Sequence, residues 1–348
     1  MELPSLNLII CAVASIAIIL LSVWGICIVL TGADQAKLPA EASSSGESME
    51  TQDVLAGTDG QTQQVSANSF DYDAFDSLSG SVTTFSLLGG GDPSLSSEDE
   101  QRILGDMEGI RSYGAAGFVF VDLKSGCGLS CNADTALYTA SSFKMPYATY
   151  ICQHLDAGDL NLEDLCTVTT SMDGTLVPGQ SYSVSDLLQD MISISGNDSF
   201  VALRNSYDQL GIDAWLAELD VYDASSGHDQ YPVSSARSFI KLWANTYDYF
   251  QSGTATSQWL MDLAANTNIS FIREALVEQG ATVLNKAGWF TTDDMYSRCI
   301  ADAGIIQDGE DHAYLMAILT NMSYDWNTAM LVETLAADLY DLRGDLVQ

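Results

Sequence analysis

The pattern of apolar and polar positions divides the chain into three stretches. Residues 8–30 carry no charged side chain, and an apolar helix of this length can cross a bilayer. Residues 32–95 are rich in Ser, Gly, Asp, Thr and Gln without a sustained apolar period, which is typical of a flexible linker. From residue 96 onward, apolar positions recur at helix and strand spacing. We therefore predict a transmembrane anchor or signal segment at 1–31, a disordered acidic linker at 32–95 and a folded domain at 96–348.

Within the folded domain, strand-like runs lie near both ends and helical periods fill the middle. Ser96 or Ser97 can cap a helix whose acidic first turn suits the positive end of the helix dipole. Helices are predicted at 98–113, 140–156 and 326–342, strands at 117–126, 281–290, 295–306 and 313–320, a hairpin return at 127–134, and a largely helical stretch up to residue 277. This order predicts an α+β fold in which one antiparallel sheet, flanked by N- and C-terminal helices, carries an inserted helical subdomain.

The strongly acidic composition restricts the choice of partners. The 348 residues include 12 basic and 47 acidic side chains, which gives a formal net charge of −35. Such a chain repels nucleic acid and anionic lipid, so we expect no nucleic-acid partner and membrane contact only through the N-terminal helix. The histidines at 154, 228 and 312 have no metal-ligand spacing, so we expect neither a metal nor another cofactor.

The flanks of the apolar run bear on localisation. Glu2 is the only charged side chain before the run and Lys37 is the first basic residue after it, so charge does not orient the segment. The small-residue stretch Ala40, Glu41, Ala42 resembles a cleavage site. We therefore expect a membrane-anchored protein with its folded domain on the extracytoplasmic side, or a secreted protein if the segment is cleaved.

Seven cysteines occur, two in the apolar run and five in the folded domain. Cys127 and Cys131 flank a short predicted turn, and Cys152 and Cys166 flank another turn that contains Gly and Asp. These spacings would allow two disulfides in an exported domain. Buried free thiols are the alternative interpretation of each pair, and at least one of the five cysteines stays unpaired.

Candidate chemistry begins at Ser141 and Lys144, three residues apart at the start of a predicted helix. This spacing places both side chains on one helix face, one turn apart. A serine hydroxyl is a poor nucleophile unless a neighbouring base takes its proton. Lysine serves as that base only if burial, a second cation or the helix N-terminus lowers its pKa far below about 10.4. The pair therefore predicts an acylable serine with a second lysine close by.

The same spacing recurs at Ser238 and Lys241, so the motif alone is a weak signal. Ser238 follows the predicted helix caps Ser234 or Ser235 and should lie inside a helix. Ser141 instead stands where a strand gives way to a helix. This context identifies Ser141 as the predicted nucleophile.

Two further short motifs complete the set. Ser195 and Asn197 fall in a predicted interhelical loop, where the hydroxyl could relay a proton and the amide could hold a substrate carbonyl. Lys286 and Gly288 fall on a predicted strand. Each motif also recurs elsewhere, at 66–68, 130–132 and 124–126. The order Ser-x-x-Lys, Ser-x-Asn, Lys-x-Gly, with each piece in its expected setting, is not easily produced by chance.

In these motifs the chain resembles the class A β-lactamases and the related penicillin-binding D-alanyl-D-alanine peptidases. The resemblance covers roughly residues 98–345 and includes the gaps between the motifs. It implies that a β-lactam or a peptidoglycan-derived peptide acylates the serine. It also implies that Lys144 is the base and that Ser195 relays the proton.

The resemblance further implies where substrate binds. The groups that would bind substrate belong to the second and third motifs and to the strand that follows: Asn197, Lys286, Gly288, Trp289 and Arg298. The backbone amides of Ser141 and Trp289 would form the oxyanion hole. Arg298 would provide a counter-charge for the substrate carboxylate, and a surface role is its alternative.

Three departures from the family pattern bear on function. Gly196 stands where aspartate is usual, and Ala287 stands where threonine or serine bonds the substrate carboxylate, so we expect weaker binding. Between Asn197 and Lys286, no segment resembles the loop that supplies the deacylating glutamate. The nearest acidic side chains between the second and third motifs are Glu218, Asp220, Asp223 and Asp229. Without a positioned base, water attacks an acyl-enzyme slowly.

Together these patterns predict a serine hydrolase that forms an acyl-enzyme on Ser141 with β-lactams or D-alanyl-D-alanine peptides. Ala287 and the missing glutamate leave an alternative of another class, a catalytically weak or silent cell-envelope binding domain that retains the fold. A third interpretation is an unrelated helical exported protein with chance motifs. Rapid turnover would indicate a lactamase, and a long-lived adduct would indicate a peptidase.

Overall fold

A computed structural model describes residues 66–77, 80–225, 227, 231–309 and 312–346. All of them lie in one compact unit of the chain, Leu55–Gln348. The predicted anchor at 1–31 and the first half of the predicted linker lie outside the described residues. No helix within the described ranges is both long enough and apolar enough to cross a membrane.

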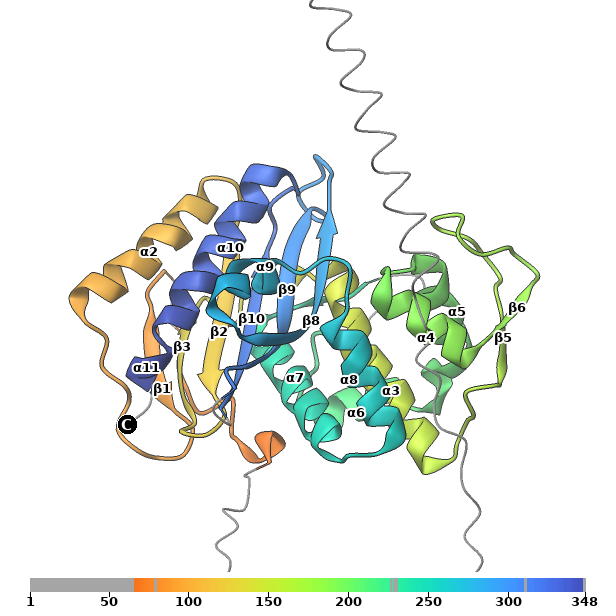
Figure 1. Cartoon of the computed structure of the whole chain (residues 1–348). Helices are drawn as coiled ribbons and strands as arrows, with labels where there is room; N and C mark the ends of the chain where they lie inside the picture. Colours follow the sequence, from red (N-terminus) through yellow and green to blue (C-terminus); the bar gives the residue numbers. More distant parts are fainter. Residues whose placement is uncertain (1–65, 78–79, 226, 228–230, 310–311, 347–348) are drawn as a thin grey trace, which may run out of the picture. The chain divides into compact units, whose positions relative to one another are not determined.

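A six-stranded antiparallel sheet forms the centre of the unit (Figure 1). In spatial order its strands are β1 (Thr83–Ser86), β3 (Cys127–Cys131), β2 (Ala116–Asp122), β10 (Ala313–Thr320), β9 (Cys299–Gln307) and β8 (Thr282–Phe290). Every residue of β2 and β10 is buried, because helices cover both faces of the sheet. These strands therefore appear in the sequence as continuous apolar runs rather than as alternating patterns.

One face of the sheet packs on helices from the two ends of the domain. These helices are α2 (Ser97–Arg111), α9 (Phe271–Leu276), α10 (Trp326–Asp341) and α11 (Arg343–Leu346). Ile103 and Met107 of α2 share a hydrophobic core with Phe118 and Phe120 of β2. Val332 of α10 belongs to the same core, and α2 and α10 lie side by side in Figure 1. Burial of this apolar face stabilises the layer, because each buried side chain of this size contributes about 1.5–3 kcal/mol.

The opposite face carries the helical subdomain. Its helices are α3 (Lys144–Ala157), α4 (Val184–Ser193), α5 (Asn197–Tyr207), α6 (Ile212–Glu218), α7 (Ala236–Gln251) and α8 (Ala255–Ala265). Two small ribbons complete it, β4 (Leu137–Tyr138) with β7 (Val233–Ser234), and β5 (Leu165–Thr167) with β6 (Ser181–Ser183). Helix α7 contacts β2, β9 and β10, and α3 packs against both α7 and α8. The predicted α+β fold with an inserted helical subdomain is confirmed.

The predicted linker at 32–95 is wrong in its second half. Residues 66–77, here called the N-terminal strap, lie on α7, and β1 adds an edge strand to the sheet. Phe75 of the strap stacks on Phe85 of β1 at 3.9 Å between ring centroids, and both rings are buried. Sparse aromatic residues anchor this segment without any regular apolar period, so the pattern alone did not reveal it.

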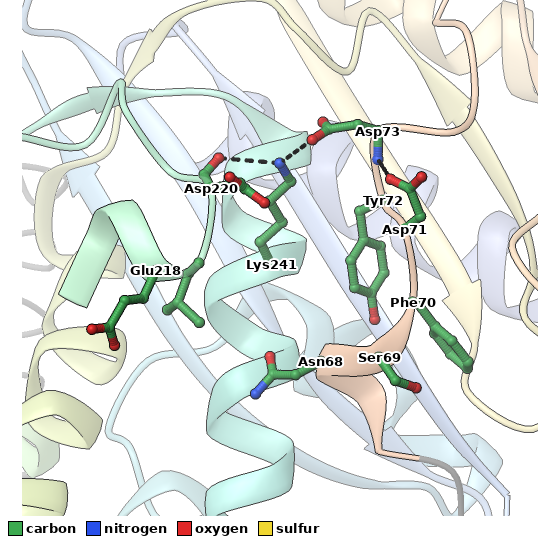
Figure 2. A pocket seen from close by; sticks show the side chains of 10 residues that line it. Asn68, Ser69, Phe70, Asp71, Tyr72, Asp73, Glu218, Asp220 and Lys241 are labelled. Carbon is green, nitrogen blue, oxygen red and sulfur yellow. Dashed lines mark hydrogen bonds and ion pairs between the residues drawn. The ribbon is translucent and has the colours of Figure 1, made fainter. Parts of the chain in front are cut away.

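Charged contacts also fix the N-terminal strap. The Lys241 amine of α7 donates to an Asp73 carboxylate oxygen at 2.7 Å and to the Asp220 carbonyl at 3.1 Å. Figure 2 shows this lysine between the strap and the end of α6, at one side of a pocket. The Arg237 guanidinium lies 4.0 Å from the Phe75 ring and donates to its carbonyl oxygen.

The five cysteines of the folded domain are free and buried. Cys127 and Cys131 are the first and last residues of β3, not the flanks of a turn. Four residues of strand rise separate them by roughly 13 Å, which is too far for a disulfide. Cys152 and Cys166 are likewise unbridged. Both cysteine pairs therefore follow the alternative interpretation, that of buried thiols.

Candidate active site

A strained turn presents Ser141 in front of α3. Thr139 is tied to the loop before β7, since its amide and its hydroxyl both donate to the Pro232 carbonyl, at 3.1 and 2.9 Å. The next residue, Ala140, has a positive φ of 44°, which is costly for a residue with a Cβ. A short 3₁₀ turn, Ala140–Phe143, follows and leads directly into α3. The backbone thereby presents Ser141 half-exposed at the helix start.

Lys144 lies one turn further on and is completely buried, with 0% relative exposure. Its amine donates to the Ser195 carbonyl, to Asn197 Oδ1 at 2.9 Å and to Ser195 Oγ at 3.4 Å. All these acceptors are neutral. Burial lowers the pKa of Lys144 well below its usual value, and the nearby charge of Lys286 lowers it further. Asp173 and Asp190 act in the opposite direction. The net shift is the one that a general base requires.

Ser195 connects the two lysines. It lies between α4 and α5 with a positive φ of 65°, and its hydroxyl accepts from the Lys286 amine at 3.1 Å. Lys286 is also fully buried, and burial lowers its pKa to about 8, although the Asp302 charge opposes this shift. One hydroxyl therefore lies within hydrogen-bonding distance of two amines, which is suitable for passing a proton between a base and a leaving group.

Asn197 and Tyr231 form a second hydrogen-bonded group beside the serine. The Tyr231 hydroxyl donates to Asn197 Oδ1 at 2.7 Å, and it lies near the Ser141 side chain. The Tyr231 ring stacks on Phe200 with centroids 4.7 Å apart. Burial raises the pKa of Tyr231, so the phenol stays protonated. Because Lys144 and Tyr231 both bind Oδ1, the Nδ2 donors of Asn197 can face a substrate carbonyl.

Strand β8 reaches the serine turn only because residue 288 is glycine. A Cβ placed on Gly288 would lie 2.6 Å from the amide nitrogen of Ser141 and 2.5 Å from that of Ser142. Any side chain there would push the strand away. This close approach brings the neighbouring Trp289 backbone toward Ser141, as the predicted oxyanion hole requires.

The structure explains the departure at Gly196. A Cβ on Gly196 would lie 1.7 Å from Asp190 Oδ2, so the carboxyl group of α4 occupies the space of a side chain at 196. The Ser199 hydroxyl donates to the same oxygen at 2.5 Å. Burial raises the pKa of Asp190. The carboxyl expected at position 196 is therefore supplied from the preceding helix.

The departure at Ala287 has no such substitute. Ala287 is fully buried and belongs to the hydrophobic core beneath α9. Arg298 lies one residue before β9, not on the strand as predicted. Its Nε is buried and has no hydrogen-bond partner among the described residues. An unpaired buried donor costs roughly 1–3 kcal/mol.

None of the described carboxylates considered as deacylating base contacts the serine. Glu218 and Asp220 line the pocket beside the N-terminal strap, next to Lys241 (Figure 2). Asp223 accepts from the Ser234 hydroxyl at 3.0 Å. Asp229 lies outside the described residues.

The carboxylate that reaches the site comes from before the second motif. Asp173 Oδ2 accepts from the backbone N–H of Asn197 at 2.8 Å. The Asp173 charge raises the pKa of Lys144 and that of Tyr231. The three sequence motifs did not predict Asp173, Asp190 or Tyr231, because nothing in the local sequence of these residues marks them. Among the described residues, no group of three His, Cys, Asp or Glu side chains could hold a metal.

Comparisons with known proteins are consistent with this geometry. The model of the β-lactamase enzyme family matches residues 101–342. No curated protein matches the chain. The solved structure of PBP-A is similar, with a TM-score of 0.60 and 20% identity over 71% of this chain and 97% of that chain. A mutant of PBP-A, solved as an acyl-enzyme complex with penicillin G, gives the same values. A β-lactamase from Chitinophaga pinensis has a TM-score of 0.59 and 17% identity over 70% of this chain and 98% of that chain.

Proposed function

Because this chain belongs to the β-lactamase enzyme family, we propose that it is acylated on Ser141 by β-lactams or by peptides that end in D-alanyl-D-alanine. The observation that carries the proposal is the environment of Lys144. This amine is fully buried, its hydrogen-bond acceptors among the described residues are all neutral, and it lies near a second lysine, so its pKa is well below the ordinary value. A neutral amine one helix turn from a serine is a competent proton acceptor.

The proposed reaction uses each group of the site once. Ser141 Oγ attacks the substrate carbonyl carbon, and its proton passes to the Lys144 amine. The oxyanion that forms is held by the backbone amides of Ser141 and Trp289, each worth about 3–4 kcal/mol in comparable sites. The oxyanion then collapses and the carbon–nitrogen bond breaks, while Ser195 gives its hydroxyl proton to the departing nitrogen and receives in its place the proton held by the Lys144 amine. Lys286 and Arg298 provide positive charge for the substrate carboxylate.

Deacylation has less support than acylation. The Tyr231 side chain beside Ser141 is a protonated phenol, which cannot act as a base. Asp173 and Asp190 are held by other donors, and neither has a hydrogen bond with Ser141 among the described residues. Water activation is therefore poor. We propose a long-lived adduct, as in a penicillin-binding peptidase, rather than rapid lactam hydrolysis.

A mass measurement tests the proposal. The full chain is incubated with benzylpenicillin and digested, and the peptide that contains Ser141 is weighed. We expect the added mass of the intact penicillin on that peptide, and its loss in Ser141→Ala but not in Ser238→Ala. Absence of any adduct would favour the alternative, a silent cell-envelope binding domain. Fast release of penicilloate would indicate a lactamase instead.

Localisation remains a separate proposal. The apolar run at 8–30 would anchor the chain, and the domain would then meet its substrates on the extracytoplasmic side. Fractionation of cells expressing the full chain, with protease added outside the cytoplasmic membrane, tests this topology. Degradation of the domain in intact spheroplasts is the expected result.

A further inference from the structure

A short loop, residues 171–176, is fixed against the start of α5 by one buried carboxylate. Asp198 is 0% exposed and accepts from the Ser171 hydroxyl at 2.7 Å and from the Leu176 amide at 3.0 Å. The Met172 and Asp173 amides donate to its other oxygen. A carboxylate with several backbone donors holds such a loop in one conformation. The loop therefore has a defined position beside Asn197.

Asp173 is the charged residue that this loop presents to the site. Its Oδ2 accepts from the backbone N–H of Asn197 at 2.8 Å. Its Oδ1 accepts from the Thr175 hydroxyl at 2.7 Å and from the Thr175 backbone N–H at 3.1 Å. The side chain is exposed at the same time, so a ligand can reach it. The nearby charge of Asp173 raises the pKa of Lys144, which places the carboxylate within electrostatic range of the reacting groups.

The orientation of Asn197 indicates which part of a substrate lies near this carboxylate. Its Oδ1 is occupied by Lys144 and Tyr231, so its Nδ2 faces the amide carbonyl of the acyl side chain if the proposed function holds. A substituent on the carbon next to that carbonyl is one bond beyond the group that Asn197 binds. The Asp173 carboxylate is bonded to the backbone of the same residue. Asp173 is thus the charged group that this loop places beside the residue that would hold the acyl side chain.

We infer that Asp173 selects acyl donors that carry an ammonium group on the carbon next to the amide carbonyl held by Asn197. The inference rests on the proposed function of Ser141. Because three donors already fix the carboxylate, it needs no reorganisation to meet a cation. A pair of opposite charges in a partly solvated site changes a rate constant by about fivefold to tenfold.

Three penicillins that differ only in the substituent on this carbon provide the test. Ampicillin carries an ammonium group, benzylpenicillin carries hydrogen and carbenicillin carries a carboxylate. Second-order acylation rate constants are measured on the full chain below the pKa of the ampicillin amine. We expect the order ampicillin, benzylpenicillin, carbenicillin in the wild type. Ratios between substrates cancel any uniform effect of a mutation on Lys144.

The decisive variant is Asp173→Asn, with Asp262→Asn as the matched control. Asp262 is an exposed residue of α8, so its substitution changes the net charge by the same amount away from the loop. In Asp173→Asn the ampicillin-to-carbenicillin ratio should fall at least about fivefold, and in Asp262→Asn it should stay at the wild-type value. Asp173→Lys should invert the order.

The outcomes separate the two proposals. An unchanged ratio in Asp173→Asn, with Ser141 still acylated, overturns the role of Asp173 and leaves the proposed function standing. Equal falls in Asp173→Asn and Asp262→Asn also overturn it, because the effect would then come from the net charge of the chain. Failure of all three penicillins to label the wild type overturns both proposals together.

Discussion

The chain contains two serine–lysine pairs of identical spacing, and their surroundings have little in common. Ser141 precedes α3 in a strained turn, and Lys144 is fully buried, with neutral acceptors for all the hydrogen bonds that it makes within the described part of the chain. Ser238 lies within the first turn of α7, where its amide donates to the capping hydroxyl of Ser235. Lys241 is paired with the Asp73 carboxylate at 2.7 Å.

The difference teaches that the neighbours of a lysine decide its chemistry. A carboxylate partner favours the charged form of an amine, whereas burial beside a second amine favours the neutral form. Lys144 has the second environment, and its pKa is lowered accordingly. Lys241 instead joins the N-terminal strap to the helical subdomain (Figure 2). The same motif is thus a candidate reaction centre in one place and a structural tie in the other.

The largest expected effect comes from removing each lysine in turn. Lys144→Met should lower the acylation rate constant by about 10²–10⁴-fold, since the proton acceptor is lost. Lys241→Met should leave this rate constant unchanged and lower the free energy of unfolding by up to about 1 kcal/mol, because the Asp73 carboxylate is largely exposed. Labelled penicillin kinetics and urea unfolding measure the two quantities. Equal losses of acylation in both variants would break the comparison.

The pH dependence of the acylation rate constant should sharpen the comparison, because it reports how a second amine affects Lys144. Acylation should rise with pH as Lys144 loses its proton, and fall above about pH 8 as Lys286 loses the positive charge that anchors the substrate. In Lys286→Ala the fall of the acylation rate constant above about pH 8 should vanish. The rising limb should also move to higher pH, because the positive charge that lowers the pKa of Lys144 is gone. At neutral pH the variant should acylate about 10–100-fold more slowly. A rising limb that stays in place would contradict the coupling between the lysines.

A smaller effect is expected from Tyr231→Phe. The ring keeps its stacking on Phe200, but the hydroxyl that donates to Asn197 Oδ1 and contacts Ser141 is removed. Loss of one such hydrogen bond should lower the acylation rate constant about threefold to tenfold. Tyr138→Phe, at the neighbouring edge-to-face ring, serves as the control and should change little. Faster acylation in Tyr231→Phe would show that the hydroxyl obstructs the substrate instead.

Much of the fold could be predicted from local patterns. The predicted cap at Ser96 is present, with its hydroxyl accepting from the Asp99 amide at 3.1 Å, and helix α3 ends at Gly158 with a positive φ of 80°. Strands β8 and β10 lie close to their predicted positions, because long apolar runs buried on both faces are unambiguous. The strap was not predicted, because it is held by isolated aromatic and charged contacts with α7 and β1.

By itself, the sequence identified the candidate nucleophile, the two lysines and the order of the three motifs. Residue type and helix spacing decide these, and both are local properties. Only the tertiary structure decided which serine–lysine pair has a lysine of lowered pKa, because burial and a second amine come from segments distant in sequence. Only the tertiary structure also revealed Tyr231, Asp190 and Asp173, because their side chains reach the site from separate loops and helices. Electrostatic effects depend on distance in space, and spacing along a chain specifies this distance only within a single element.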